Sequence, residues 1–283
     1  MAWAELSDVR CYYEVLGHGD PLLLIPGLGL TCRTWEEVAP ELAQHFSLIL
    51  LDNRGIGQSQ AKRPPRSLAD YSADVVELLD ELQLDRVHVL GLSLGGIIAQ
   101  RVAVDHPGRV NRLVLVSCTD RFSAYLQQTA QLLGHALRRF SWESFVRMSE
   151  MLGTSPEYFD RENAQVEQRI RAKCAAPSNR RGVACQLRCV ARSEMEPSDY
   201  RILAPTLVIA GQDDRLIPSC YAQSMAAKIP HSQFVLFPKI GHNPFQECPQ
   251  EVIGRIVEFL NQRGADPGQG SSQNARQRTE QCS

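Results

Sequence analysis

The chain has 283 residues, of which 43% are hydrophobic, so it can bury a substantial core in one large domain with an insertion. Its formal net charge of −2 gives no electrostatic reason to expect nucleic acid or an anionic membrane as a partner. Binding to either is therefore not indicated.

The amino terminus and the cysteines determine the expected compartment. Residues 1–6 lack a basic region followed by an apolar core, and no later stretch approaches the roughly 18–20 apolar residues of a membrane span. The nine cysteines are an odd number without a framework, which suits a reducing cytoplasm. Cys185 and Cys189 are one helical turn apart, but no histidine or further cysteine stands at zinc spacing. We therefore expect a cytoplasmic protein with free thiols and no metal.

The first part of the chain alternates strands with helices. Residues 8–16 are predicted as an opening strand, and residues 17–20 as a hairpin turn into the continuous apolar run 21–25. The pattern then predicts a helix at 34–42, a strand at 46–51, a polar loop at 60–67, a helix at 72–84, a strand at 86–90, a helix at 96–105 and a strand at 112–117. Such alternation predicts a mostly parallel sheet with helices on both faces, so function belongs at the carboxyl ends of the strands.

The alternation stops between residues 119 and 200, where four amphipathic helices are predicted at 125–140, 142–152, 163–173 and 181–192. We interpret this segment as a helical lid over the carboxyl edge of the sheet, with residues 1–118 and 201–262 as the core. Its larger apolar side chains either line a substrate pocket or, as is more frequent, pack the lid helices together; they are Tyr125, Phe140, Trp142, Phe145, Met148 and Met151.

The sheet pattern resumes after the lid, with strands at 206–210 and 233–237 and a last helix at 249–260. Residues 263–283 are rich in Gly, Gln, Ser and Arg and have no periodic apolar face. We expect a disordered tail there.

Ser93 is the predicted nucleophile. It stands in Gly91-Leu92-Ser93-Leu94-Gly95, between a β-branched strand and an apolar helix, which is the context that a nucleophile elbow requires. Glycine at 91 and 95 avoids collisions of Cβ atoms in so tight a turn. The amino end of the following helix favours developing negative charge.

A serine hydroxyl needs a base to take its proton and a carboxylate to orient that base. Of the seven histidines, His242 stands out because it follows a late strand in a loop, as Gly241-His242-Asn243-Pro244. Asp213 and Asp214 both follow the strand that ends at residue 210, and Asp120 follows another strand end, so the residues alone leave three candidate carboxylates.

The oxyanion of an acyl-transfer reaction needs two N–H donors. One expected donor is the main-chain N–H of Leu94, which follows the nucleophile. The other belongs in the loop after the strand that ends at residue 25, Pro26-Gly27-Leu28-Gly29, where we choose the N–H of Leu28.

These motifs resemble the α/β-hydrolase fold, and in particular the small lid-bearing branch with 3-oxoadipate enol-lactone hydrolases, carboxylesterases and carbon–carbon bond hydrolases. The resemblance covers about residues 10–261 and rests on four segments, 52–59, 91–96, 211–218 and 241–242. By this resemblance the acid falls three residues after the strand-ending glycine, which selects Asp214 over Asp213. A serine at position 93 differs from the aspartate of haloalkane dehalogenases and epoxide hydrolases. The family commonly has His-Gly where this chain has Pro26-Gly27, and a main-chain donor should survive that change.

The predicted function is a cofactor-independent hydrolase that cleaves a carboxylic ester or lactone through an acyl-enzyme, with Ser93, His242 and Asp214 as triad. A small-molecule substrate is the expected partner of a monomer or homodimer. One alternative keeps the triad and cleaves a carbon–carbon bond in a vinylogous diketone, with lid arginines Arg138, Arg139, Arg181 or Arg192 binding the dienoate. Another is a ligand receptor on the same fold with little turnover.

Overall fold

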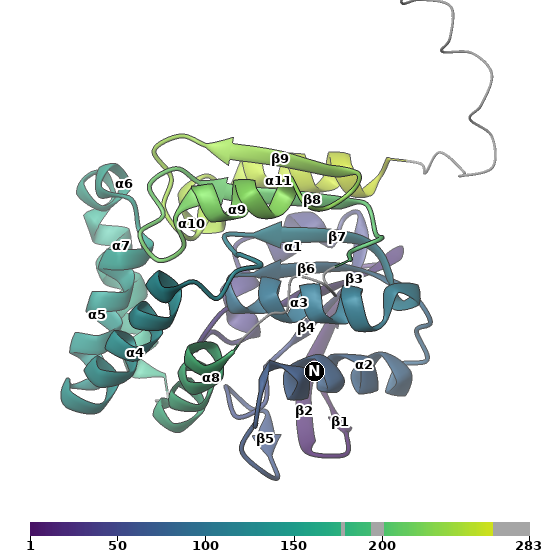
Figure 1. The fold of residues 1–283 in the computed structure, drawn as a ribbon, viewed down its shortest axis with the longest axis horizontal. Helices are drawn as coiled ribbons and strands as arrows, with labels where there is room; N and C mark the ends of the chain where they lie inside the picture. The colour runs from purple at the N-terminus through teal and green to yellow at the C-terminus, as the bar shows by residue number, and fades with distance from the viewer. Residues whose placement is uncertain (177–178, 194–200, 263–283) are drawn as a thin grey trace, which may run out of the picture.

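A computed structural model describes residues 1–176, 179–193 and 201–262 of the chain. A nine-stranded sheet runs through it in the order β1-β2-β4-β3-β6-β7-β8-β9, with β5 paired to β2 (Figure 1). The strands are β1 (Ala2–Glu5), β2 (Val9–Leu16), β3 (Asp20–Ile25), β4 (Phe46–Leu51), β5 (Gln60–Ala61), β6 (Val87–Leu92), β7 (Val110–Val116), β8 (Thr206–Gly211) and β9 (Ser232–Phe237). From β4 to β9 the neighbours pair in parallel, as the alternation predicts, while β1, β2 and β5 pair antiparallel.

The hairpin predicted at residues 17–20 is wrong. β2 pairs with β4, and β3 lies between β4 and β6. The turn does exist, with φ of +79° at Gly17, but it crosses the start of β4, where a Cβ on Gly17 would lie 2.5 Å from the carbonyl oxygen of Phe46. β3 is buried from Leu22 to Ile25 and so takes a central place, whereas the partly exposed β2 lies further out.

Two short strands lie where the sequence pattern indicated no strand. β1 is an edge strand of four residues that pairs only with β2, and β5 interrupts the predicted polar loop at 60–67 by pairing with Val9 and Arg10. The helix predicted at 34–42 is a 3-10 turn, η1 (Cys32–Trp35), followed by one short helix, α1 (Ala39–Leu42). Elements of two to four residues carry too little periodicity to be recognised.

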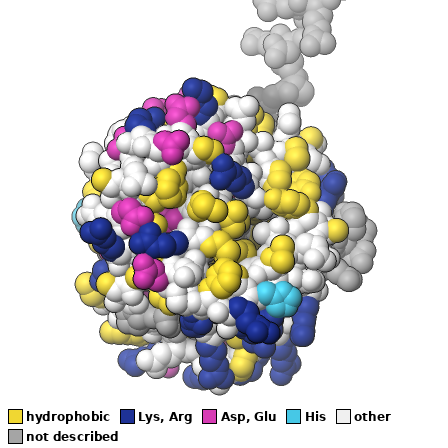
Figure 2. All heavy atoms as spheres, turned by 90° about the vertical axis from the view of Figure 1, so that its left-hand side faces the viewer, with side chains coloured by type: hydrophobic (Ala, Val, Ile, Leu, Met, Phe, Trp, Pro, Cys, Tyr) yellow, Lys and Arg dark blue, Asp and Glu magenta, His cyan; other side chains and the backbone are white. Residues whose placement is uncertain are grey.

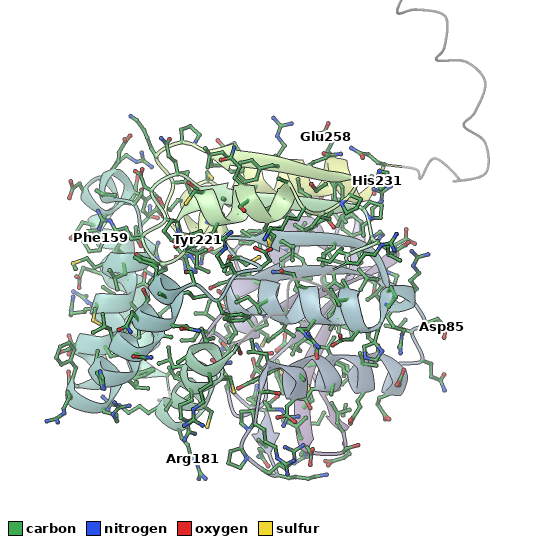
Figure 3. The ribbon with its side chains drawn as sticks, in the orientation of Figure 1. Asp85, Phe159, Arg181, Tyr221, His231 and Glu258 are labelled. Carbon is green, nitrogen blue, oxygen red and sulfur yellow. The ribbon has the colours of Figure 1, made fainter. Side chains whose placement is uncertain are left out.

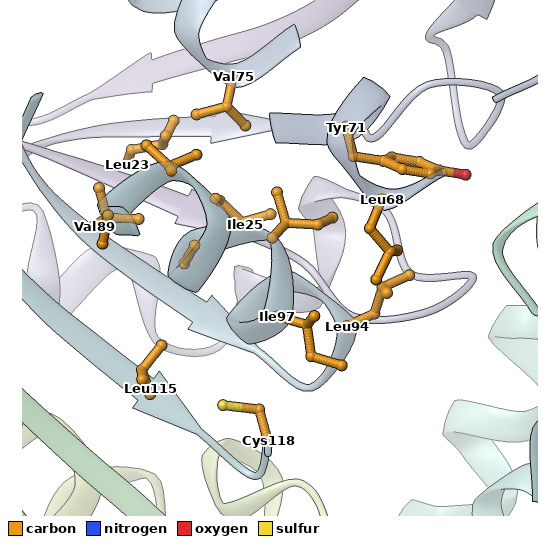
Figure 4. Close-up of a cluster of buried hydrophobic side chains, with 14 of the residues drawn as sticks. Leu23, Ile25, Leu68, Tyr71, Val75, Val89, Leu94, Ile97, Leu115 and Cys118 are labelled. Atoms are coloured by element: carbon orange, nitrogen blue, oxygen red, sulfur yellow. The ribbon is translucent and has the colours of Figure 1, made fainter. Parts of the chain in front are cut away.

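Helices cover both faces of the sheet. One face carries α2 (Leu68–Glu81), α3 (Leu94–Asp105) and α9 (Ser219–Ala226), and the other carries α1 and α11 (Pro249–Leu260) (Figure 1). Alternate residues of β3 serve the two cores, with Leu23 and Ile25 in the first and Leu22 and Leu24 in the second. Figure 4 shows the first core, where Leu94 and Ile97 of α3 pack near Ile25 and Cys118. The remaining short elements are η2 (Pro107–Arg109) and α10 (Pro244–Glu247).

The described part of the lid segment contains five helices between β7 and β8. They are α4 (Ala124–Arg139), α5 (Trp142–Gly153), α6 (Pro156–Arg161), α7 (Asn163–Ala175) and α8 (Arg180–Arg192), and they stand beside the carboxyl ends of the central strands (Figure 1). The sequence pattern missed α6, which has only six residues. The predicted disordered tail, 263–283, lies outside the described residues. No helix in the described ranges is both long and apolar enough to cross a membrane.

Candidate active site

Ser93 lies at a sharp turn between β6 and α3. Its backbone φ of 55° and ψ of −117° are unfavourable for a residue with a Cβ. The turn closes only because its neighbours are small: a Cβ on Gly91 would lie 2.4 Å from the carbonyl oxygen of Gly95. A Cβ on Gly95 in turn would lie 2.1 Å from the carbonyl oxygen of Ile25. The strand–turn–helix geometry presents the hydroxyl at the carboxyl edge of the sheet.

The structure brings Ser93, His242 and Asp214 into one hydrogen-bonded chain. His242 Nε2 lies 2.8 Å from Ser93 Oγ, and His242 Nδ1 lies 2.7 Å from Asp214 Oδ2. An ionised carboxylate can only accept, so the proton of a neutral imidazole belongs on Nδ1. Nε2 is then an acceptor and can take the proton of the serine hydroxyl. The imidazole is 12% exposed, which leaves it reachable from solvent.

Asp214 is the carboxylate that contacts the histidine. Its side chain has no exposed surface, and its Oδ1 accepts the main-chain N–H groups of Leu216 at 2.9 Å and Ile217 at 2.8 Å. These two bonds fix the orientation of the carboxylate. Asp120 forms an ion pair with Lys228 at 2.6 Å instead. Asp213 donates its main-chain N–H to Ile240, and its side chain makes none of the contacts found at His242.

The loop of residues 26–29 lies directly against the turn at Ser93. A Cβ on Gly27 would lie 3.3 Å from the Cβ of Ser93. Leu28 follows and is half-buried against the core. Leu94 is the first residue of α3, where main-chain N–H groups have no partner within the helix. The N–H groups of Leu28 and Leu94 therefore belong to segments that flank the serine.

Two side chains that sequence reasoning missed hold this loop. Gln186 of α8 has no exposed surface, and its Oε1 accepts the main-chain N–H of Gly29 at 2.7 Å. Asn53 Nδ2 donates to the carbonyl of Pro26 at 3.1 Å. Gln186 could have been found from the sequence, because it is a polar residue on the apolar face that Val183 and Val190 share in α8.

A third missed residue is Glu247, whose Oε1 accepts the main-chain N–H of Gly241 at 3.1 Å. It is buried at the end of α10, a helix of only four residues. Such a short helix gives no periodic pattern from which the burial of a carboxylate can be predicted.

The larger apolar side chains of the lid divide between packing and exposure. Phe145 is buried, and Trp142, one turn earlier on α5, stacks on it with ring centroids 5.7 Å apart. Trp142 also donates its indole N–H to the carbonyl of Lys173 at 3.4 Å, which connects α5 to α7. Three others are exposed on the surface: Tyr125, Phe140 and Met151. Tyr125 also donates its hydroxyl to the carbonyl of Arg215 at 2.8 Å, which connects α4 to the loop after Asp214.

The lid arginines face solvent. Arg138, Arg139, Arg181 and Arg192 are exposed, and Arg181 points away from the body of the molecule (Figure 3). On the face of the molecule that Figure 2 shows, which is the left-hand side of Figure 1, Lys and Arg side chains gather along the lower edge. The structure therefore does not place any of the four where it would bind a buried dienoate.

All eight cysteines of the described residues are free thiols. Cys185 and Cys189 are buried free thiols of α8. No group of three or more His, Cys, Asp or Glu side chains suited to a metal ion occurs within the described ranges. His88 lies inside β6, where burial lowers the pKa of its imidazole. His231 directly precedes β9 (Figure 3), so it lies at the amino edge of the parallel strands, whereas Ser93 follows the carboxyl end of β6.

A parallel sheet with this strand order, helices on both faces and a serine at the turn after β6 define the architecture of α/β hydrolases. Residues 20–249 match the family described as alpha/beta hydrolase fold, and the chain belongs to that family. The fold and family expected from the sequence are thus confirmed.

Three known proteins illustrate the similarity. A hydrolase from Pseudomonas aeruginosa PA01 is 32% identical, with a TM-score of 0.83 over 92% of this chain and 98% of that one. A thermophilic esterase from Thermogutta terrifontis is 26% identical, with a TM-score of 0.82 over 92% and 98% of the two chains. A protein of Azorhizobium caulinodans named "Putative carbamate hydrolase RutD" is 28% identical over 82% of this chain and 88% of its own length. Together these relatives support a hydrolase on this fold.

Proposed function

We propose that the protein is a serine hydrolase that cleaves a carboxylic ester or lactone through an acyl-enzyme. The observation that carries the proposal is the contact of 2.8 Å between His242 Nε2 and Ser93 Oγ, backed by the buried carboxylate of Asp214. A hydroxyl that donates to an imidazole oriented in this way becomes a nucleophile at neutral pH.

The reaction has two halves. Ser93 Oγ attacks the carbonyl carbon while His242 takes the hydroxyl proton, and His242 then gives that proton to the leaving alcohol oxygen as the carbon–oxygen bond breaks. In the second half His242 takes a proton from water while the water oxygen attacks the acyl-enzyme, and His242 then gives that proton to Ser93 Oγ as the acyl–oxygen bond breaks, which releases the acid and the free serine. The N–H groups of Leu28 and Leu94 stabilise the oxyanion in both halves. These steps need only side-chain and main-chain groups of this chain and water.

The substrate class rests on chemistry and on the relatives. The esterase relative favours a carboxylic ester, and the carbamate hydrolase relative favours a carbamate, whose carbonyl the same serine would attack. The carbon–carbon alternative requires polar groups that bind a dienoate, and the four lid arginines considered for that role are exposed. The binding-protein alternative does not require the serine–histidine contact that this chain has.

The test is hydrolysis of p-nitrophenyl esters from acetate to octanoate, with an enol-lactone, an alkyl carbamate and a dienoate diketone alongside. Each is run with the wild type and with Ser93→Ala, and a fluorophosphonate is used to label the nucleophile. We expect turnover of an ester or lactone and labelling of Ser93, both lost in the variant. Labelling without turnover of esters and lactones would overturn the substrate class, and absence of labelling would favour a binding protein.

A further inference from the structure

The lid meets the histidine loop at one tightly packed place. The histidine loop, residues 240–243, lies against the corner between α5 and α6, residues 153–155 (the lid corner). His242 donates its main-chain N–H to the carbonyl of Gly153 at 2.8 Å. A Cβ on Gly153 would lie 3.9 Å from the Cβ of His242, so these two segments are in direct contact.

A buried carboxylate joins the two segments a second time. Glu247 Oε1 accepts the main-chain N–H of Gly241 at 3.1 Å and the main-chain N–H of Ser155 at 3.1 Å. One oxygen therefore satisfies a donor from the histidine loop and a donor from the lid corner. A buried N–H without an acceptor costs free energy, so both segments depend on this oxygen.

The two segments and the carboxylate are tightly packed at this place. A Cβ on Gly241 would lie 2.6 Å from the nitrogen of Ser155 and 2.7 Å from Glu247 Oε1. Loss of the Glu247 side chain would therefore remove both the shared acceptor and the atoms that the two segments pack against.

Glu247 is buried within the influence of one positive charge of the lid. Burial raises the pKa of its carboxyl, and the positive charge of Arg169 on α7 acts in the opposite direction. Arg169 also forms an ion pair with Glu150, which Lys173 contacts in turn. Glu150 is thus a second buried carboxylate near the lid corner, and its ion pairs are made with side chains of α7.

We propose that Glu247 is a positioning residue that sets the place of His242 by joining the histidine loop to the lid corner. The proposal rests on the proposed role of His242 as the general base. The main-chain N–H that Glu247 fixes belongs to the residue next to His242, so its loss moves the imidazole relative to Ser93 Oγ. Displacements of about 1 Å in such a contact reduce turnover by up to about 10²-fold.

The test compares Glu247→Ala, Glu247→Gln and the matched control Glu150→Ala. Glutamine keeps an oxygen that accepts both N–H groups, whereas alanine removes it. We expect Glu247→Ala to lower kcat more than about tenfold with KM changed less than about threefold. We expect Glu247→Gln to stay within about threefold of wild type, and Glu150→Ala to lose stability but not kcat. If Glu247→Ala does not fold, Glu247→Asp, in which the acceptor is drawn back by one methylene, replaces it.

A second readout does not depend on activity. Hydrogen exchange followed by mass spectrometry should show faster exchange of peptides from both the histidine loop and the lid corner in Glu247→Ala, and of lid peptides alone in Glu150→Ala. Unchanged exchange in the histidine loop, or a folded Glu247→Ala with wild-type kcat, would overturn the proposal. Low kcat in Glu247→Gln equal to that of Glu247→Ala would also overturn it, because the shared acceptor would then not be the cause. Altered exchange in a chain whose wild type is neither active nor labelled would instead overturn the proposed function alone.

Discussion

Gly95 lies against the main-chain carbonyl of Ile25, where an added Cβ would be 2.1 Å from the oxygen. The contact brings the start of α3 against the end of β3, and the loop of residues 26–29 begins at that point. One glycine thus sets the distance between the serine turn and the loop that carries a proposed oxyanion donor.

Gly95→Ala should destabilise the protein by about 3 kcal/mol, because the new methyl group meets main-chain atoms that cannot rotate away. Gly254→Ala is the matched control in α11, where an added Cβ meets nothing within 4 Å. It should stabilise the fold by about 0.5–1 kcal/mol through helix propensity. Urea unfolding followed by circular dichroism measures both. Equal stability of the two variants would contradict the packing at Gly95.

Ser93→Gly should be more stable than Ser93→Ala by about 1 kcal/mol, although neither variant has a nucleophile. The φ of 55° and ψ of −117° at this position strain any residue with a Cβ, and glycine relieves that strain at some cost in chain entropy. Thermal unfolding of the two variants under identical conditions checks the order. A higher melting temperature for Ser93→Ala would show that the backbone there is unstrained.

The sequence predicts the fold well wherever an element is long or wholly apolar. β4, α11 and the lid helix α8 lie within about one residue of their predicted ranges. The error at residues 17–20 has a physical origin, since a turn with two glycines suits a hairpin and also suits a crossing over a third strand. The choice is made by β4, whose burial between β2 and β3 is a property of the whole sheet.

The candidate site also contains residues that the sequence predicts and residues that it does not. Ser93, His242 and Asp214 belong to loops that follow strands, and parallel strands bring such loops to one edge, so their meeting can be anticipated from the sequence. Gln186 accepts a main-chain N–H from 157 residues away in the chain, and Glu247 accepts one from 92 residues away and one from six residues away. No spacing rule in the sequence relates a side chain to a main-chain donor that lies so far away in the chain, as Gly29 lies from Gln186. The catalytic roles of the triad residues and of Leu28 and Leu94 stay proposals, and the variant of Asp214 described next tests the role of the orienting acid.

Asp214→Asn should lower kcat by roughly 10³–10⁴-fold with the fold retained. Oδ1 accepts the N–H groups of Leu216 and Ile217, so the oxygen of the new amide takes that place and its NH₂ faces His242. Nδ1 must then accept, and the ring proton moves to Nε2, where it prevents uptake of the Ser93 proton. Asp213→Asn is the control and should keep wild-type kcat. Steady-state kinetics that showed similar losses in both variants would argue against Asp214 as the orienting acid.

The thiols should differ widely in reactivity. Cys220 is exposed, whereas Cys11, Cys118 and Cys189 are buried. Burial raises the pKa of Cys11 to about 12 and of Cys189 to about 11, so little thiolate is present at neutral pH. Brief treatment of the native protein with iodoacetamide should modify Cys220 and leave these three unmodified until urea is added. Peptide mass spectrometry identifies the sites, with Cys220→Ser as the control. Early modification of Cys118 would contradict the packing around α3.

The stability of the protein should carry a pH dependence that originates at Glu247. Burial raises the pKa of this carboxyl in the folded state above its ordinary value of 4.5. At pH values between 4.5 and the pKa of the folded state, the folded state therefore binds more protons than the unfolded state. The contribution of Glu247 is therefore largest below pH 4.5 and decreases as the pH rises through the pKa of the folded state.

Glu247→Gln removes this titration and keeps the acceptor for Gly241 and Ser155. The free energy of unfolding of the wild type should thus fall relative to that of Glu247→Gln as the pH rises from 4 to 7, by about 1.4 kcal/mol for each pH unit of displacement in the pKa. Urea unfolding at half-unit steps of pH measures the difference. Glu258→Gln is the control, because the Glu258 side chain is 65% exposed and should give a flat difference. If this difference in the free energy of unfolding does not change with pH, or if the wild type gains stability relative to Glu247→Gln as the pH rises, burial does not raise the pKa of the Glu247 carboxyl.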